Sequence, residues 1–286
     1  AGAFLWVPGW LLMLVAVAVI AAGLLGSQKG VRPSELNQKK KPQAPGPAFE
    51  ATGKAIPDLT RLPGFRMVFD RRVGVPALKA TMLLLAILVI VDGLLGPRLS
   101  PMNLAGVLPW THWRAFTVLA LLLVGNLFCM GCPFTFARDL ARRLVVPRLV
   151  WPKALRGKWL AFGLLVTFLW AYEVFDLWDN SRATAFLLLA FFSGAILVDT
   201  LFKGASFCKH VCPIGQFHFM GSMNSPFEVR VREPAVCSSC RTFDCIRGNE
   251  QQRGCELKLF QPKKSGNLDC TFCLDCVAAC PHENVG

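Results

Sequence analysis

Residues 77–95 read ALKATMLLLAILVIVDGLL, an apolar run with one lysine near its start and one aspartate near its end. A helix of roughly 20 mainly apolar residues is long enough to cross about 30 Å of hydrocarbon. Further stretches of this kind lie at about residues 4–25, 113–130, 159–178 and 183–202. One such stretch would suit a buried helix of a soluble protein, but five of them predict an all-α, multi-pass membrane domain with five transmembrane helices.

The composition of the whole chain agrees with a membrane protein. Of its 286 residues, 53% are hydrophobic and only 17% are charged, whereas about a quarter of the residues of a soluble domain are charged. The formal net charge of +13 would also suit a nucleic-acid-binding surface. The basic residues, however, gather in the loops between the apolar stretches, so we expect membrane lipid around the chain and no nucleic-acid partner.

The same basic residues predict the orientation of the spans. Residues 26–79 hold eleven Lys and Arg and residues 132–158 hold seven, whereas the loops at 96–112 and 179–182 hold one each. Because basic loops remain in the cytoplasm, we expect a bacterial inner-membrane protein with its N-terminus outside and its C-terminus in the cytoplasm. The stretch at 4–25 lacks the basic residues that begin a signal peptide, so it is predicted to be a retained span.

Four regions are expected along the chain. They are an N-terminal transmembrane helix at 1–25, a Pro- and Lys-rich cytoplasmic linker at 26–75, a four-helix membrane domain at 76–225 and a small cysteine-rich domain at 226–286. Within the membrane domain, residues 134–146 alternate apolar and basic side chains at helical spacing. Such a helix is expected to lie flat on the inner membrane surface.

The cysteines are unevenly distributed, with eight of the twelve between residues 237 and 280. The run that starts at Cys270 is spaced C-x2-C-x2-C-x3-C-P, which is the full bacterial pattern for 4Fe–4S clusters. In this pattern three thiolates on a tight loop bind one cluster, while the fourth opens a helix and reaches the neighbouring cluster. Here the fourth is Cys280, and the Pro281 that follows suits the first turn of a helix.

The first cysteine run is stretched, with x4 where x2 is usual, x9 where x3 is usual and Glu256 in place of proline. The ligand count is still eight, which predicts two 4Fe–4S clusters in a small α+β, dicluster ferredoxin-like domain. Cluster set 1 is expected to be Cys237, Cys240, Cys245 and Cys280, and cluster set 2 to be Cys255, Cys270, Cys273 and Cys276. A further strand normally closes this fold, so we expect a longer chain or a partner to complete it.

Disulfides and zinc are the alternatives for these eight cysteines. Disulfides are disfavoured on the reducing, cytoplasmic side of a membrane. Zinc usually takes two CxxC pairs without a crossing fourth cysteine. Two iron–sulfur clusters are therefore the preferred interpretation.

The other four cysteines, here termed the membrane-edge thiols, are Cys129, Cys132, Cys208 and Cys212. Each pair ends in Cys-Pro at the predicted cytoplasmic end of a span, so both pairs are expected at one membrane depth. They are predicted to converge on a third metal or redox site, for which a 4Fe–4S cluster is one option. Redox-active thiols and separate structural cysteines are the alternatives. His210, within the second pair, is interpreted as a surface histidine rather than a ligand.

Ionisable residues inside predicted spans are costly and indicate function. Asp92 and Glu173 lie near the predicted outer ends of their spans, in the same layer as His112. Oxidation of a quinol releases protons, which carboxylates and a histidine accept, so these three residues form a candidate quinone and proton site. The alternative is that they meet headgroup water at helix ends. Asp199, near the inner end of its span, is expected to pair with an arginine or lysine.

Residues 75–286 resemble the NapH/NosR-type membrane polyferredoxins. In that family, transmembrane helices carry two Cys-x3-Cys-Pro motifs on the cytoplasmic side, followed by two ferredoxin-type cluster motifs. The resemblance rests on the two Cys-Pro pairs and on the complete motif from Cys270. This chain departs from the family at Cys129-x2-Cys132, which is one residue shorter, in its stretched first cluster motif and in its additional N-terminal span and linker.

The resemblance implies electron transport between cytoplasmic-side 4Fe–4S clusters and a quinone pool or a partner redox subunit of a respiratory-chain complex. The corresponding enzymatic role would be quinone or ferredoxin oxidoreductase activity. The alternative is an accessory or maturation factor whose Cys-Pro thiols bind or reduce a metal for a partner enzyme. The sequence contains no phosphate-binding loop and no hydrolytic motif, which disfavours nucleotide-driven or hydrolytic functions.

Overall fold

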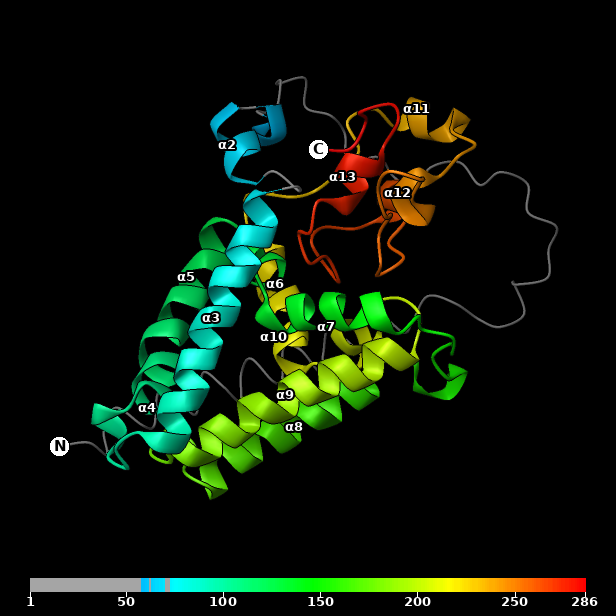
Figure 1. Ribbon diagram of the computed structural model, residues 1–286. Helices are drawn as coiled ribbons and strands as arrows, with labels where there is room; N and C mark the ends of the chain where they lie inside the picture. Colours follow the sequence, from blue (N-terminus) through cyan, green and yellow to red (C-terminus); the bar gives the residue numbers. More distant parts are fainter. Residues whose placement is uncertain (1–57, 62, 70–72) are drawn as a thin grey trace. The chain divides into compact units, whose positions relative to one another are not determined.

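The computed structural model describes residues 58–61, 63–69 and 73–286, and its regular structure is helical (Figure 1). The predicted span at 4–25 and most of the predicted linker lie outside these described residues. The α-helices are α2 (Pro63–Val68), α3 (Gly74–Leu95), α4 (Leu104–Val107), α5 (Arg114–Leu123), α6 (Leu127–Met130), α7 (Pro133–Leu144), α8 (Trp159–Val174), α9 (Ser181–Leu201), α10 (Pro213–Gly221), α11 (Pro234–Ser239), α12 (Asp244–Arg247) and α13 (Asp275–Ala279). The 3-10 turns are η2 (Leu59–Arg61), η3 (Ser100–Met102), η5 (Lys153–Leu155), η7 (Ser222–Asn224) and η8 (Gln261–Lys263), and the π-helical turns are η4 (Leu108–Trp113) and η6 (Phe207–Val211).

Two described helices, α3 and α9, are long and apolar enough to cross a membrane. They correspond to the predicted spans at 77–95 and 183–202. Residues 104–123 and 127–144 also qualify together, as a broken span or a re-entrant loop bent by 111°, whereas α8 is apolar but shorter. The described residues therefore hold two or three candidate spans, and the predicted total of five is not confirmed. Exposed apolar side chains line α3, among them Leu84, Leu88, Val91 and Leu95.

The helix predicted at 113–130 is interrupted, and the interruption positions Cys129. Gly125 follows α5 with a φ of +89°, a left-handed conformation that glycine adopts without strain. A Cβ atom at this position would lie 2.8 Å from the ring of Phe272. Asn126 then caps α6, because its Oδ1 accepts a hydrogen bond from the Cys129 N–H at 3.4 Å. The prediction of one continuous helix is therefore wrong, and hydropathy missed the break because both sides of it are apolar.

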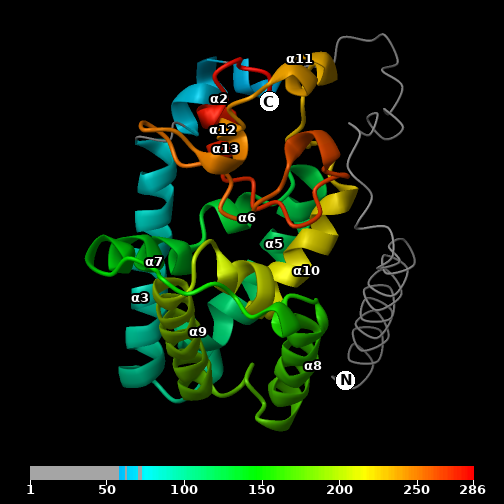
Figure 2. The ribbon, with the colours of Figure 1, turned by 90° about the vertical axis from the view of Figure 1, so that its right-hand side faces the viewer.

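Helices α3, α7 and α9 pack on one another, and α7 lies crosswise to the two long helices (Figure 2). This crosswise helix corresponds to the amphipathic helix predicted at 134–146. The close approach of α3, α4 and α9 depends on small residues. A Cβ atom at Gly93 of α3 would lie 2.9 Å from the Cβ atoms of both Ala105 and Ala185.

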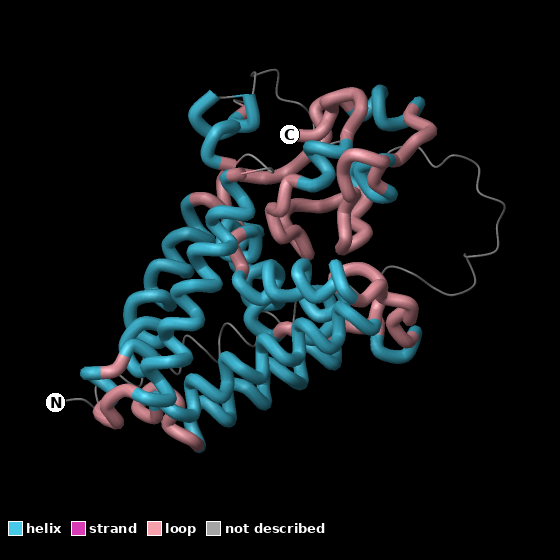
Figure 3. Tube along the Cα trace, in the orientation of Figure 1, coloured by secondary structure: helices cyan, strands magenta, loops and turns pink. Residues whose placement is uncertain are grey.

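The cysteine-rich segment, residues 226–286, folds around a small core of Val229, Cys270, Phe272, Cys276 and Val285. Figure 3 shows this segment mostly as loop, and no strand forms in the described part of the chain. Val231 and Val285 form an isolated antiparallel bridge, next to backbone hydrogen bonds of 2.9 and 3.0 Å between Arg230 and Gly286. The predicted α+β fold is thus not confirmed, because the closely spaced cysteines require turns that leave little room for strands.

Part of the predicted linker is folded. Its last described residues form η2 and α2, and Asp58 lies directly before η2. The Asp58 carboxylate accepts a hydrogen bond from Arg232 Nε at 2.7 Å, and Arg232 Nη2 also donates to Thr60 at 3.1 Å. This end of the region is therefore held against the cysteine-rich segment rather than extended.

Candidate functional site

The loop of cluster set 2 turns tightly between its cysteines. Phe272 and Leu274 have φ values of 53° and 58°, and α13 then begins, which places Cys276 in its first turn. The four members of this set lie close together. They are near enough that thiolates at any two of the positions would repel each other. Cys255 joins the other three although it comes from the first cysteine run.

Cluster set 1 has the same local structure. Phe243 has a φ of 55° and precedes α12, which places Cys245 in the first turn of that helix. Cys245 interacts electrostatically with each of the other three members, Cys237, Cys240 and Cys280. Cys280 directly follows α13 and does not open a helix, so that part of the spacing argument is wrong. The packing of α12 on α13 carries Cys280 across to this set.

The nine residues between Cys245 and Cys255 form a closed excursion. The Cys255 N–H donates to the Cys245 carbonyl at 2.9 Å, so the two ends of the excursion meet. A Cβ atom at Gly254 would lie 2.5 Å from the backbone nitrogen of Gly248. The place where the two ends of the excursion meet therefore has no room for a side chain. The insertion therefore lengthens the run without separating its two cysteines.

Side-chain amides donate hydrogen bonds to sulfur in both sets. Asn284 Nδ2 donates to Cys237 Sγ at 3.3 Å, and the Asn284 N–H donates to Cys280 Sγ at 3.4 Å. Gln261, which is buried, donates from Nε2 to Cys276 Sγ at 3.4 Å. Hydrogen bonds of this kind tune iron–sulfur clusters, and sequence reasoning did not identify either amide.

Burial raises the pKa of thiols in both sets. It raises the pKa of Cys270 to about 12 and that of Cys245, which also faces Cys280, to about 11. These thiols are protonated at neutral pH when no metal is bound. Metal binding therefore has to displace their protons.

The membrane-edge thiols come from two equivalent turns. Cys132 and Cys212 each precede a proline that begins a helix, α7 and α10 respectively, while Cys129 lies in α6 and Cys208 in η6. The four membrane-edge thiols lie close together. They are near enough that thiolates at any two of these positions would repel each other. The Gly215 N–H already donates to Cys212 Sγ at 3.2 Å.

The donor chemistry of these cysteine sets suits an iron–sulfur cluster. Among the described residues, no three His, Cys, Asp or Glu side chains are placed to hold one ion. In a cubane, each cysteine binds a different iron atom, so the four sulfurs stand further apart than around one ion. Sets of four thiols with amide donors at the sulfurs fit iron–sulfur chemistry.

One small cavity separates two of these cysteine groups. Cys129 and Cys208 of the membrane-edge thiols line it, and so do Cys255 and Cys273 of cluster set 2. Its volume is about 40 Å³, which is large enough to hold water. Members of the membrane-edge thiols and of cluster set 2 therefore line one common cavity.

Asn126 joins the same two groups through hydrogen bonds. This side chain is fully buried, and its Nδ2 donates to the Cys270 carbonyl at 2.9 Å while its Oδ1 caps the turn that holds Cys129. Sequence reasoning missed Asn126, because nothing in its own segment indicates that its partner lies 144 residues away.

Two histidines lie beside the membrane-edge thiols. His210 is only 8% exposed and stacks on Trp151 with ring centroids 5.2 Å apart, so the expectation of a surface histidine is wrong. His218, which sequence reasoning missed, is buried with Nδ1 3.7 Å from Cys129 Sγ. Burial lowers the pKa of both histidines to about 4, so both are neutral at physiological pH.

The three residues of the candidate quinone site have different surroundings. Asp92 Oδ2 accepts a hydrogen bond from the Leu104 N–H at 2.6 Å, so this carboxylate stabilises the start of α4. His112 is exposed in η4, and Glu173 is partly exposed near the end of α8. Neither is among the described hydrogen-bond partners of Asp92. A quinone site at these residues stays a prediction.

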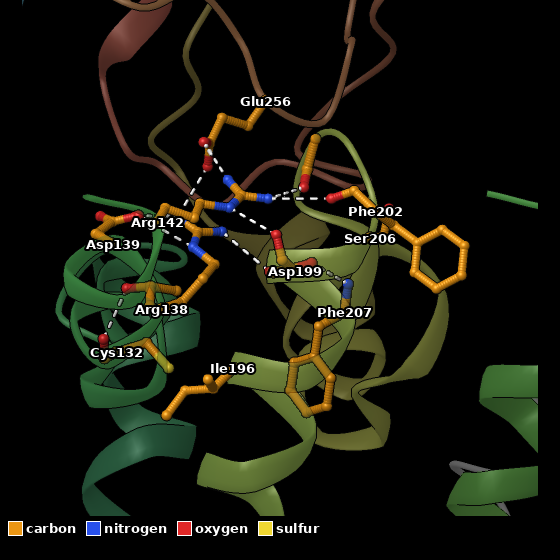
Figure 4. A network of polar contacts seen from close by, with 12 residues as sticks. Cys132, Arg138, Asp139, Arg142, Ile196, Asp199, Phe202, Ser206, Phe207 and Glu256 are labelled. Carbon is orange, nitrogen blue, oxygen red and sulfur yellow. Dashed lines mark hydrogen bonds and ion pairs between the residues drawn. The ribbon is translucent and has the colours of Figure 1, made fainter. Parts of the chain in front are cut away.

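A buried network of charges lies above Cys132 (Figure 4). Arg138 of α7 contacts Asp139 at 2.7 Å, Glu256 at 2.8 Å and Asp199 at 3.4 Å. The expected pairing of Asp199 is thereby confirmed, and its Oδ1 also accepts from the Phe207 N–H at 2.8 Å at the start of η6. Burial alone would raise the pKa of Glu256, but Arg138 and two further arginines hold it below its usual range. The carboxylate is therefore ionised.

Comparison with known proteins points to the same chemistry. Residues 108–152 and 184–219 match the family described as "4Fe-4S binding domain", and these two segments contain the four membrane-edge thiols. The chain is also similar to an uncharacterized protein of Methanocaldococcus jannaschii, with 25% identity over 175 residues, 58% of this chain and 66% of the relative. No solved structure matches the chain.

A second relative has a functional name. The chain is 30% identical over 86 residues to the candidate electron transport protein YccM of Escherichia coli, a match that covers 30% of this chain and 22% of the relative. The chain thus spans less than two thirds of the length of either relative. Together the matches support a ferredoxin-type iron–sulfur protein of electron transfer, without singling out the NapH/NosR type.

Proposed function

We propose that this chain is a membrane-bound electron-transfer protein with two 4Fe–4S clusters, held by cluster sets 1 and 2, and a third iron–sulfur site held by the membrane-edge thiols. The onward partner would be quinone or another redox subunit of a membrane complex. The observation that carries the proposal is the cavity lined by Cys129 and Cys208 on one side and by Cys255 and Cys273 on the other. Such clusters, when bound, supply one-electron transfer.

The residues around each set suggest its place in the relay. Ser239 and Arg241, beside Cys240, are exposed, so a soluble donor or acceptor would approach cluster set 1. Cys270 and Cys276 of cluster set 2 are buried, which suits an internal position in the relay. The membrane-edge thiols form the third position, next to the apolar helices.

A cytoplasmic location of the cysteine-rich segment is part of this proposal. Lys158, in the basic segment at 132–158, forms an ion pair with Asp269 and donates to Gln216 at 2.8 Å. Lys209 Nζ donates to the Leu257 carbonyl at 2.7 Å. These contacts support a cysteine-rich segment on the same side as the basic loop, which the loop charges assign to the cytoplasm.

The alternative role, delivery of a metal to a partner enzyme, has less support. Delivery requires thiols that a partner can reach. Cys212 is buried, while Cys129 and Cys208 line the same small cavity as Cys255 and Cys273 of cluster set 2. This placement favours a resident cofactor over a transferred one.

The test uses the full chain, purified without oxygen and examined by iron and sulfide analysis and by an EPR-monitored redox titration. We expect three iron–sulfur signals. The double variant Cys129→Ser/Cys212→Ser should remove one signal and keep two, whereas Cys240→Ser, the matched control, should remove the signal of cluster set 1. Loss of no signal in the double variant would contradict the third site, and reduced clusters that a quinone analogue never reoxidises would contradict the quinone partner.

A further inference from the structure

Arg138 places a buried positive charge beside the membrane-edge thiols. The residue is only 4% exposed, and its guanidinium interacts electrostatically with Cys132 and Cys208. Figure 4 shows it above Cys132, between α7 and the cysteine-rich segment. A charge in such a poorly solvated position acts more strongly on its neighbours than a charge in water.

Glu256 places a negative charge at the other side of the same contact. It directly follows Cys255, at the position where the cluster pattern normally has proline. Its carboxylate binds Arg138 Nη2 at 2.8 Å and Arg142 Nη1 at 2.9 Å. Arg138 and Glu256 both line the cavity between the membrane-edge thiols and cluster set 2.

The two charges therefore form a dipole along the line that joins the two cysteine groups. Its positive end lies at the membrane-edge thiols and its negative end adjoins Cys255 of cluster set 2. A cluster becomes more negative when it is reduced, so a nearby cation raises its reduction potential and a nearby anion lowers it. Asp139 and Asp199 on the same guanidinium reduce the effect of the cation, and Lys79, 3.6 Å from Asp139, offsets part of that reduction. Arg142 and Arg253, which pair with Glu256 at 2.9 and 3.5 Å, likewise reduce the effect of the anion.

We propose that the Arg138–Glu256 pair sets the direction of electron flow, by raising the reduction potential of the membrane-edge site relative to that of cluster set 2. Electrons then move from the cysteine-rich segment toward the membrane. This inference rests on the proposed function, because it requires an iron–sulfur site at the membrane-edge thiols. Arg138 and Glu256 act here through their charges, since neither residue is a ligand of a cluster.

The experiment is a redox titration of each EPR signal in the full chain and its variants. Arg138→Met should lower the potential of the membrane-edge signal enough to change its ratio of oxidised to reduced form at least tenfold at a fixed potential, about 59 mV for one electron. Arg138→Lys, which keeps the charge, should restore most of that shift. Glu256→Gln should instead raise the potential of the cluster set 2 signal.

Arg143→Gln is the matched control, because it removes the same charge from an exposed position of the same helix, and it should shift neither signal. If Arg138→Met does not fold, Arg138→Met/Glu256→Gln removes the pair together, and its membrane-edge potential should fall below that of Glu256→Gln alone. A membrane-edge signal that is present but unshifted overturns this inference only. A wild-type chain without that signal overturns the proposed function, and this inference with it.

Discussion

At the scale of single residues, Asn126 links the turn that holds Cys129 to the cysteine-rich segment. Both ends of its buried amide are used, one by the turn of Cys129 and one by the carbonyl of Cys270. A buried polar group that loses its partner costs more than the hydrogen bond itself contributes. Substitutions at Asn126 should therefore affect both the stability of the chain and the link between the two cysteine groups.

Asn126→Ala should lower the free energy of unfolding by about 1–3 kcal/mol, because the Cys270 carbonyl and the Cys129 N–H both lose their partner. The measurement is thermal or denaturant unfolding in detergent. Asn126→Asp keeps the acceptor for the Cys129 N–H but places a buried carboxylate oxygen against the Cys270 carbonyl, so it should lose at least as much. Asn180→Ala is the control, since Asn180 also caps a helix, through a 3.0 Å bond to the Ala183 N–H, but at an exposed position. If Asn126→Ala lowered the free energy of unfolding by no more than Asn180→Ala does, the link between Asn126 and the cysteine-rich segment would be contradicted.

The two amides that donate to sulfur should tune different clusters. Each hydrogen bond stabilises the more negative, reduced form by about 1 kcal/mol, which is roughly 40 mV for one electron. Asn284→Ala should lower the potential of cluster set 1, and Gln261→Leu that of cluster set 2, in a redox titration. Each variant is the control for the other, and a shift of both signals by either variant would contradict this assignment.

At the scale of elements, the helix packing depends on Gly93, where α3, α4 and α9 meet. Gly93→Leu should lower the free energy of unfolding by about 1–3 kcal/mol, because added atoms force packed helices apart. Gly163 is the matched control, since it lies in apolar α8 with no atom within 4 Å of its Cβ position. Gly163→Leu should be neutral or stabilise the chain by up to about 1 kcal/mol through helix propensity. Equal shifts of the unfolding temperature in detergent for both variants would contradict the close packing of α3, α4 and α9 at Gly93.

Local sequence predicted some elements better than others. The helices α3, α7 and α9 lie close to the ranges expected from hydropathy and amphipathic spacing, because those signals are carried by side chains of the helix itself. The break after α5 was missed. It depends on one left-handed residue, Gly125, and on the Phe272 ring that occupies the space beside it.

At the scale of the whole molecule, the membrane helices and the cysteine-rich segment should differ in their response to metal removal. Two of the five buried residues in the core cluster around Phe272 are cysteines, Cys270 and Cys276, and no strand supports residues 226–286 in the described structure. Metal binding and folding are coupled in small metal-dependent domains. Removal of iron by a chelator under reducing conditions should therefore loosen this segment selectively.

Hydrogen exchange followed by mass spectrometry measures this effect. Peptides from residues 226–286 should lose most of their protection after chelation, while those from α3 and α9 keep theirs, because lipid or detergent and helix packing hold those two helices. The chelator with its metal already bound is the control. Unchanged protection in residues 226–286 after verified iron loss would show that the segment folds without metal.

The sequence by itself determined the kind of chemistry and the local elements. Four-cysteine spacings, Cys-Pro pairs and long apolar runs are local patterns, and they suffice to predict thiol ligands and the helices α3 and α9. Only the tertiary structure decided which thiols face each other, that Asn126 reaches Cys270 and that Glu256 meets Arg138. These contacts join residues far apart in the chain, so they depend on how α7, α9 and the cysteine-rich segment pack and not on any property of one segment alone.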